Sequence, residues 1–185
     1  LDFLKIKEVS PKDFMDKNFD EPVYTNIDVL DYNYSNSIDN TVSNFYKFPE
    51  QFVSSFSKFS SVADIYFAGH YHNPKAPKLI TLDNIKNNSF KIDVIADISC
   101  DIDGPIASTI RPSSIDDPIY GFNKTNFKEC DFHESNAIAV MAVDNLPCEL
   151  PRNSSEMFGE MFLAHVIPSF FNNDNRDILK NSRIT

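Results

Sequence analysis

The stretch DVIADISCDIDGP, residues 93–105, decides how this chain is expected to fold. Its first half is a run of apolar, mainly β-branched residues, which predicts a buried strand over residues 93–98. Three carboxylates lie at or beyond the carboxyl end of this strand: Asp97, Asp101 and Asp103. Ligands of open α/β sheets bind outside the carboxyl ends of the strands. We therefore expect the functional site at this edge.

Length, composition and charge describe an ordinary globular chain. It has 185 residues, of which 42% are hydrophobic and 24% charged, enough for about one domain with a sizeable core. The formal net charge of −10 disfavours nucleic acid or an anionic membrane as the main partner. No apolar run approaches the roughly 18 residues that a membrane span needs. An odd number of widely spaced cysteines and no signal-peptide pattern indicate a cytoplasmic protein without a disulfide framework.

Strand and helix patterns alternate along the chain. The near-continuous apolar run at 63–68 is typical of a parallel strand covered on both faces. Phenylalanines at spacings of three and four predict an amphipathic helix from Pro49 to Phe59. The other expected elements are strands at 6–9, 23–30, 107–110, 119–122 and 138–143, and helices at 79–85 and 153–171, with the end of a helix at 1–4. A helix or turn is expected to start at 10–13, with Ser10 as N-cap and Pro11 at the first position. This order predicts a parallel sheet with flanking helices, in an α/β domain over residues 1–150, followed by a helix and tail over 151–185.

Three segments resemble a known family. They are ADIYFAGHYHNPKAPKLIT (63–81), VIADISCDIDGPI (94–106) and VMAVDNLPCELPRNSSEMFG (140–159). Together they are similar to the nucleotide-binding half of the group of saccharopine dehydrogenase (L-lysine-forming) and lysine–2-oxoglutarate reductase, within the alanine dehydrogenase and transhydrogenase fold family. The pairing of D-I-S-x-D with D-N-L-P-x-x-L-P and a following helix carries the resemblance, which extends from residue 1 to about 171.

The resemblance implies a Rossmann-like parallel sheet that lacks its first glycine-rich βα unit. It also implies that the chain is the carboxyl-terminal part of a two-domain oxidoreductase. The enzymes of this group use NAD or NADP to form or split the secondary amine that joins lysine to 2-oxoglutarate. In this family a glycine-rich phosphate-binding turn is expected just before residue 1. A preceding amino-terminal domain supplies the catalytic Lys and His. The resemblance thus implies that the helix after Pro151 packs toward that domain, that this chain alone is not competent, and that a homodimer is possible.

The resemblance also assigns site residues. It makes Asp101 the catalytic carboxylate, facing the nicotinamide ribose and the reacting carbon. It places six residues at the cofactor: His70, Asp97, Asp101, Asp144, Asn145 and Leu146. The alternative is ordinary turn chemistry, in which the acids cap a turn, the residues before Pro147 form another, and His70 is a loop histidine.

A metal site is the weaker interpretation of the H-x-H sequence at His70 and His72. Two imidazoles on one side of an extended segment are a conceivable metal pair, but no third ligand follows at a motif spacing. We expect no metal.

Three functions remain open from the sequence. The first is an oxidoreductase of saccharopine dehydrogenase type, which transfers a hydride at the carbon bonded to a secondary amine. The second is an alanine dehydrogenase-like enzyme for a smaller amino or oxo acid. The third is a non-catalytic module with the same fold that binds a ligand. The choice between NAD and NADP is also open.

Overall fold

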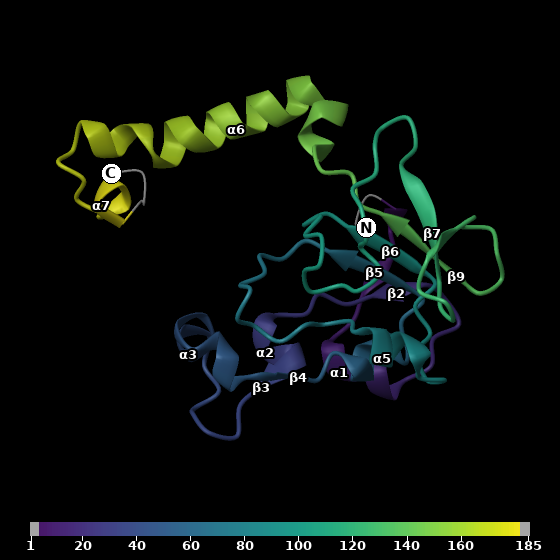
Figure 1. The fold of residues 1–185 in the computed structure, drawn as a ribbon. Coiled ribbons are helices and arrows are strands. Elements are labelled where there is room, and N and C mark those ends of the chain that lie inside the picture. Colours follow the sequence, from purple (N-terminus) through teal and green to yellow (C-terminus); the bar gives the residue numbers. More distant parts are fainter. Residues whose placement is uncertain (1–3, 182–185) are drawn as a thin grey trace. The chain divides into compact units, whose positions relative to one another are not determined.

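The computed structural model describes residues 4–181 and divides the chain into two compact units, Leu1–Asp144 and Asn145–Thr185. The first unit is a mixed α/β fold with a central sheet that contains parallel strands and has flanking helices (Figure 1). This is the predicted fold class. The helix end predicted at residues 1–4 lies mostly outside the described residues.

The central sheet has five strands in the order β5 (Ile65–Ala68), β6 (Val94–Asp97), β9 (Ala137–Met141), β7 (Ile119–Asn123) and β8 (Glu129–Cys130). The strands β5, β6 and β9 run parallel, as the apolar runs predict. The strands β7 and β8 extend the sheet in antiparallel fashion. Antiparallel neighbours need only short connections, so this part of the sheet forms within residues 119–141.

One face of the sheet carries the core of the first unit. The helices α1 (Pro11–Asp16), α2 (Val29–Tyr32) and α5 (Leu82–Lys86) lie on the same side of the sheet (Figure 1). The short helix α4 (Ser57–Ser60) adds Phe59 to the buried cluster on that face. The cluster also contains Phe56, Ile80, Ile95, Ile106, Tyr120, Phe122, Ile138 and Val140.

The opposite face of the sheet is apolar and exposed in the first unit. Ile65 and Phe67 of β5 are 53% and 56% exposed, and Val94 beside them is exposed as well. The prediction that the strand at 63–68 is covered on both faces is therefore wrong for the unit by itself. A continuous apolar run cannot tell which parts of a protein supply the cover.

The amino-terminal elements are shorter than predicted. The strands β1 (Lys7–Glu8) and β2 (Val23–Tyr24) pair in parallel. Helix α1 begins as predicted, with the Ser10 hydroxyl accepting a hydrogen bond from the Asp13 N–H at 3.1 Å. The strand predicted at 23–30 ends at Tyr24. Beyond it the Asp28 N–H donates to the Asp31 carboxylate at 2.7 Å, which favours the start of helix α2.

The amphipathic helix predicted at 49–59 is absent from the described structure. That segment instead contains a 3₁₀ turn (Pro49–Gln51), strand β4 (Val53–Ser54) and helix α4, and helix α3 (Val42–Lys47) precedes it. Strand β4 pairs with β3 (Asn33–Tyr34). Four of the five phenylalanines at 45–59 are nevertheless buried, and the rings of Phe45 and Phe52 lie edge to face with their centroids 5.2 Å apart. These side chains are buried by tertiary packing of several short elements, and not along one face of a single helix.

Two further predictions differ from the structure, one in the type of element and one in its start. The strand predicted at 107–110 is a set of turns, with one isolated bridge from Ile80 to Ile106. The helix predicted at 79–85 is α5, which begins after Thr81, whose hydroxyl accepts a hydrogen bond from the Asn84 N–H at 3.2 Å.

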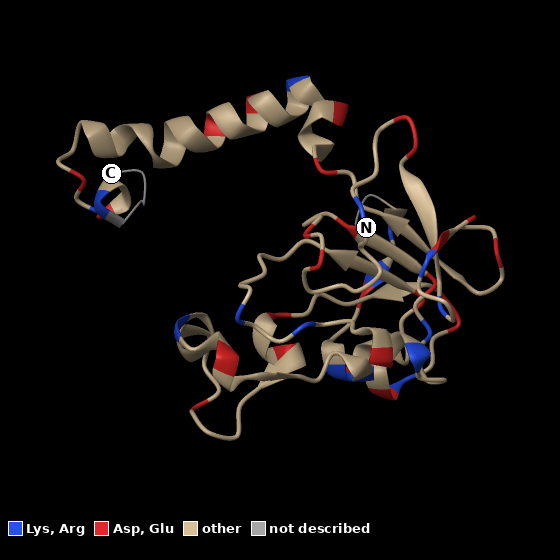
Figure 2. Cartoon of the chain, in the orientation of Figure 1, with Lys and Arg blue, Asp and Glu red and all other residues tan. Residues whose placement is uncertain are grey.

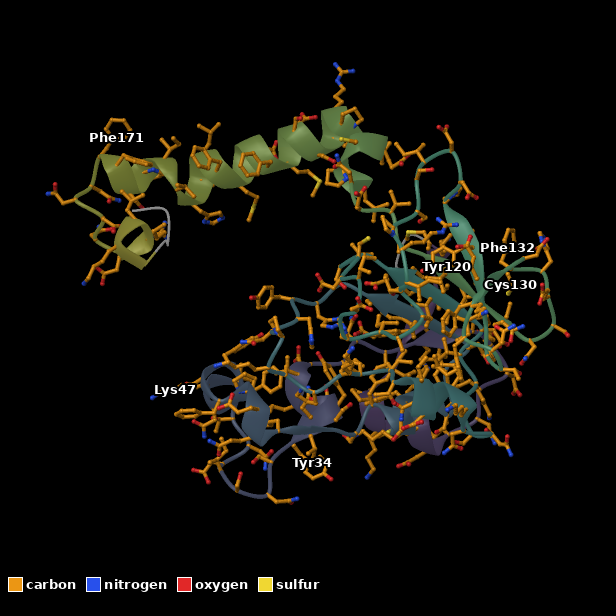
Figure 3. The ribbon with its side chains drawn as sticks, in the orientation of Figure 1. Tyr34, Lys47, Tyr120, Cys130, Phe132 and Phe171 are labelled. Carbon is orange, nitrogen blue, oxygen red and sulfur yellow. The ribbon has the colours of Figure 1, made fainter. Side chains whose placement is uncertain are left out.

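The second unit consists of helices. It contains a 3₁₀ turn (Leu146–Glu149), helix α6 (Pro151–His165), a second 3₁₀ turn (Ile167–Phe170) and helix α7 (Ile178–Asn181). Helix α6 begins two residues earlier than predicted, because Pro151 is well suited to its first turn, and it ends at His165. It has no buried residue, and the nearby Phe171, labelled in Figure 3, is 85% exposed.

Acidic and basic residues are interspersed along both units (Figure 2). In the described part of the chain, no helix is both long and apolar enough to span a membrane.

Candidate functional site

The carboxyl ends of β5 and β6 are level with each other. Ala68, the last residue of β5, pairs with Asp97, the last residue of β6. The N–H groups of Ile98 and Ser99 both donate to the Ala68 carbonyl, at 2.9 and 3.2 Å. The segments that follow the two strands therefore start side by side, as parallel strands in register require.

Asp97 is buried beneath this edge. Its side chain is 0% exposed, and it accepts hydrogen bonds on both carboxylate oxygens. Oδ1 accepts from the Ser99 hydroxyl at 2.6 Å and from the Cys100 N–H at 3.1 Å. Oδ2 accepts from the Thr109 hydroxyl at 2.6 Å. Such donors stabilise a buried carboxylate that would otherwise be costly.

Cys100 connects the edge of β6 to the end of β9. Its φ of 49° is in the left-handed region, which non-glycine residues adopt rarely. The thiol donates to the Ala142 carbonyl at 3.0 Å, just beyond β9. Burial raises the pKa of the Cys100 thiol, and the carboxylates of Asp97, Asp144 and Asp101 raise it further. The charges of three of the predicted site residues therefore act on one thiol.

Asp101 is partly buried, and its charge acts on two histidines. Its backbone carbonyl accepts from the Gly104 N–H at 2.9 Å, and this contact closes a tight turn. Within the described residues its carboxylate accepts no hydrogen bond from the chain, whereas its charge acts on both His70 and His72. Lys78, in the loop that follows β5, also binds this turn. Its ammonium group donates to the Asp103 carbonyl at 2.9 Å.

His70 follows β5 and leaves a buried nitrogen unpaired. Its Nε2 atom has no hydrogen-bond partner among the described residues. Burial lowers the pKa of His70 below its ordinary 6.5, although the Asp97 and Asp101 charges act in the opposite direction. Burial likewise lowers the pKa of His72. The site thus presents a neutral imidazole beside a carboxylate. In residues 4–181, no group of three or more His, Cys, Asp or Glu side chains could hold a metal ion.

The remaining predicted residues follow β9. Asp144 is exposed and ends the first unit, and its charge reaches Cys100. Asn145 and Leu146 come next in the chain but belong to the second unit. The structure therefore brings four of the predicted residues together on the first unit: His70, Asp97, Asp101 and Asp144.

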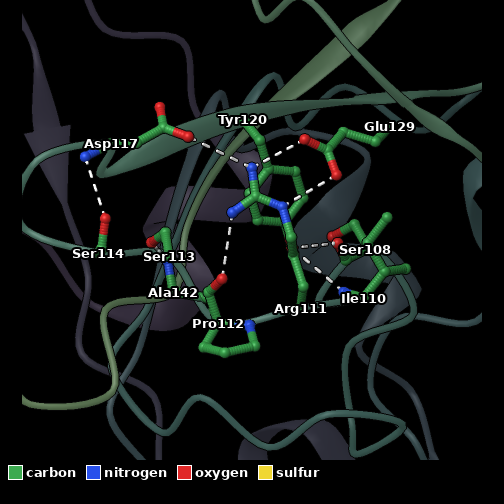
Figure 4. Close-up of polar contacts among 10 residues, drawn as sticks. All are labelled: Ser108, Ile110, Arg111, Pro112, Ser113, Ser114, Asp117, Tyr120, Glu129 and Ala142. Atoms are coloured by element: carbon green, nitrogen blue, oxygen red, sulfur yellow. Dashed lines mark hydrogen bonds and ion pairs between the residues drawn. The ribbon is translucent and has the colours of Figure 1, made fainter.

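Sequence reasoning did not find the residues that support this edge. Thr109 binds Asp97 across 12 positions, and no short motif links them. Figure 4 shows a second group, in which the Arg111 guanidinium lies 4.5 Å from the Tyr120 ring centroid and pairs with both Glu129 oxygens, at 2.8 and 2.9 Å. Tyr120 donates to the Ser108 carbonyl at 2.9 Å and accepts from the Ile110 N–H at 3.1 Å. These contacts hold the segment that carries Thr109 against the sheet.

Comparison with known proteins identifies the fold family. Residues 68–184 match the family model of the alanine dehydrogenase/PNT C-terminal domain. The chain belongs to this family. The match begins at the end of β5 and includes β6, β9 and every residue predicted at the site.

The curated relatives are named as alpha-aminoadipic semialdehyde synthases and as L-lysine-forming saccharopine dehydrogenases. The chain is 29% identical over 128 residues to alpha-aminoadipic semialdehyde synthase of Arabidopsis thaliana, a match that covers 67% of this chain and 12% of that protein. It is 25% identical over 138 residues to the mitochondrial alpha-aminoadipic semialdehyde synthase of Bos taurus, covering 65% of this chain and 15% of that protein. It is 28% identical over 108 residues to saccharopine dehydrogenase [NAD(+), L-lysine-forming] of Emericella nidulans, covering 57% of this chain and 28% of that protein. The chain therefore spans only a small part of the length of these relatives.

The edge fits a nicotinamide nucleotide. The unpaired Nε2 of His70 can donate to or accept from a ligand, depending on its tautomer. The Asp101 carboxylate can accept from hydroxyl groups. A ribose and a carboxamide offer the matching groups, and the site lies where dinucleotides bind in sheets of this kind.

Proposed function

We propose that the chain is the carboxyl-terminal part of an NAD(P)-dependent amino-acid oxidoreductase of saccharopine dehydrogenase type, which acts on CH–NH bonds. The observation that carries this proposal is that the Asp101 carboxylate accepts no hydrogen bond from the described residues, while its charge acts on His70, whose buried Nε2 also has no partner there. The family and the names of the relatives support the reaction class.

Asp101 is the catalytic carboxylate in this proposal. A bound nicotinamide nucleotide exchanges a hydride with the substrate carbon next to the secondary amine. Asp101 accepts hydrogen bonds from the ribose hydroxyls and stabilises the positive charge that develops on the substrate nitrogen. Since its carboxylate has no partner in the described structure, no internal hydrogen bond has to break first.

His70 and the β9 turn complete the nucleotide contacts. A neutral His70 binds the nicotinamide end without adding a positive charge beside the hydride carbon. Asp144, Asn145 and Leu146 lie on the turn after β9 and contribute side-chain and backbone groups to the same end. Asp97 supports this site from inside the fold, through its hydrogen bonds to Ser99, Cys100 and Thr109.

Proton transfer and substrate binding fall to other parts of a longer enzyme. The small share of each relative that this chain matches supports such a partner domain. The exposed apolar face formed by Ile65, Phe67 and Val94 supports it too, because large apolar patches usually meet another surface. Helix α6, with its exposed apolar residues, is proposed to pack toward that domain.

The test is turnover by the full-length protein. Loss of NADH or NADPH is followed with lysine plus 2-oxoglutarate and, separately, with pyruvate plus ammonia. Turnover with the lysine pair supports the proposal. Turnover with pyruvate alone would support the alanine dehydrogenase-like alternative, which the family description also permits. Nucleotide binding without turnover would indicate a ligand-binding module. Imaging of the tagged protein tests the proposed cytoplasmic location.

A further inference from the structure

The position of Asp97 argues against direct contact with a ligand. Its carboxylate is fully buried and already accepts three hydrogen bonds from the chain. A carboxylate offers about four lone-pair positions, so the chain already occupies most of them. Its strand neighbour Ile95 points to the same buried face of the sheet. Asp97 therefore acts inside the fold.

The hydrogen bonds of Asp97 fix both ends of one loop. Ser99 and Cys100 lie at its start, and Thr109 lies at its end. Between them are Asp101 and the turn closed by Gly104. One buried side chain thus determines where Asp101 stands relative to the end of β6.

The Asp97 carboxylate also sets the distance between the turn that carries Asp101 and the turn that carries Asp144. The Cys100 N–H binds Asp97, and the Cys100 thiol binds the Ala142 carbonyl. Ala142 lies two residues before Asp144. The Ala142 N–H donates to the Ser113 hydroxyl at 2.9 Å, and this hydrogen bond also holds the end of β9. A shift of Cys100 would therefore displace Asp101 and Asp144 relative to each other.

We propose that Asp97 is a positioning residue, which acts with Thr109 through the loop 98–109 to hold Asp101 at the nucleotide. This inference rests on the proposed function. The left-handed conformation of Cys100 supports it, because such a conformation in a non-glycine residue persists only where the surrounding structure enforces it. The hydrogen bond from the Cys100 N–H to Asp97 is one of the contacts that enforce it.

The experiment uses the full-length enzyme with three variants in this segment. Thr109→Val keeps the shape of the side chain but removes the donor to Asp97, and Thr109→Ser keeps the hydroxyl. Ser108→Ala is the matched control, because the neighbouring Ser108 is equally buried and its Oγ has no partner among the described residues. Titration with NADH or NADPH gives Kd, and steady-state kinetics give kcat and KM.

The expected result is a loss in Thr109→Val of roughly ten- to a hundredfold in kcat/KM, the scale of an ångström-sized misplacement. Thr109→Ser and Ser108→Ala behave like wild type. Unfolding midpoints, measured alongside, confirm that each variant is folded at the assay temperature. Equal kinetics in Thr109→Val and Ser108→Ala would overturn the proposal.

A double-mutant cycle separates positioning from direct contact. If Asp97 acts through Asp101, Asp97→Asn has little further effect once Asp101→Asn is present. Additive losses would show that Asp97 contacts the ligand itself and would overturn the proposal. A wild-type enzyme that binds neither nucleotide would refute the proposed function instead, so the two failures are distinguishable.

Discussion

Gly104 lies so close to Asp101 that a Cβ at position 104 would come within 2.5 Å of the Asp101 Cβ and 2.6 Å of the Asp101 carbonyl oxygen. Contacts this short do not occur between real side chains, and one of the two partners here is backbone. The turn that presents Asp101 therefore requires glycine at position 104 for space.

Gly104→Ala should distort the turn and destabilise the protein by about 1–3 kcal/mol, the usual cost of overpacking. Denaturant unfolding measures the change. Gly69→Ala is the matched control, because nothing lies within 4 Å of its added Cβ. We expect the control to be neutral or slightly stabilising. Equal unfolding free energies for the two variants would contradict the steric argument.

Tyr120→Phe tests the contacts that hold the loop 98–118 to the sheet. The substitution leaves the Ile110 N–H and the Ser108 carbonyl without their partner, which costs about 1–3 kcal/mol for buried groups. The measurement is the free energy of unfolding. Tyr46→Phe on the exposed surface is the control, with little expected effect. A Tyr120→Phe protein as stable as the control would show that these hydrogen bonds are replaced by water.

His70 should titrate below its ordinary pKa of 6.5, because burial disfavours its charged form. In the unfolded chain the same imidazole takes up its proton at higher pH. The free energy of unfolding should therefore fall as pH decreases from 6.5 to the folded-state pKa, and His70 should contribute no further change below it. Imidazole NMR signals and a stability profile of His70→Gln measure both effects. A midpoint at or above 6.5 would contradict this prediction.

Cys100 should be slow to alkylate at neutral pH. Burial raises the pKa of its thiol, and the surrounding carboxylates disfavour the reactive thiolate. Cys148 is exposed and should react first. Mass spectrometry of the partly iodoacetamide-treated protein gives the rate at each site. Cys100 labelling as fast as Cys148 labelling would show that the acids do not gather around it.

Much of the site could be predicted because it depends on strand ends. The apolar runs before Gly69, Asp97 and Asp144 located three parallel strands, and parallel strands in register must bring their carboxyl ends to one edge. The acids beyond them followed from the sequence directly. Their roles came from the family resemblance and not from spacing.

The supporting contacts could not be predicted in the same way. The hydrogen bond between Thr109 and Asp97 joins residues that no local pattern relates, and it depends on the path of an irregular loop. The phenylalanines at 45–59 led to the wrong prediction of a helix for a related reason. Apolar spacing reports that side chains are buried, but Val53 and Ser54 enter a strand pair that helical periodicity does not anticipate.

Binding of reduced nucleotide by the full-length protein and its Asp101→Asn variant tests the central claim most directly. Asn keeps the size of the side chain and removes the charge. Hydrogen bonds to charged groups contribute about 1.5–3 kcal/mol, so we expect Kd for NADH or NADPH to rise roughly ten- to a hundredfold in the variant. Fluorescence titration measures it. Equal affinity of wild type and Asp101→Asn for the nucleotide would contradict the assignment of this edge as the nicotinamide site.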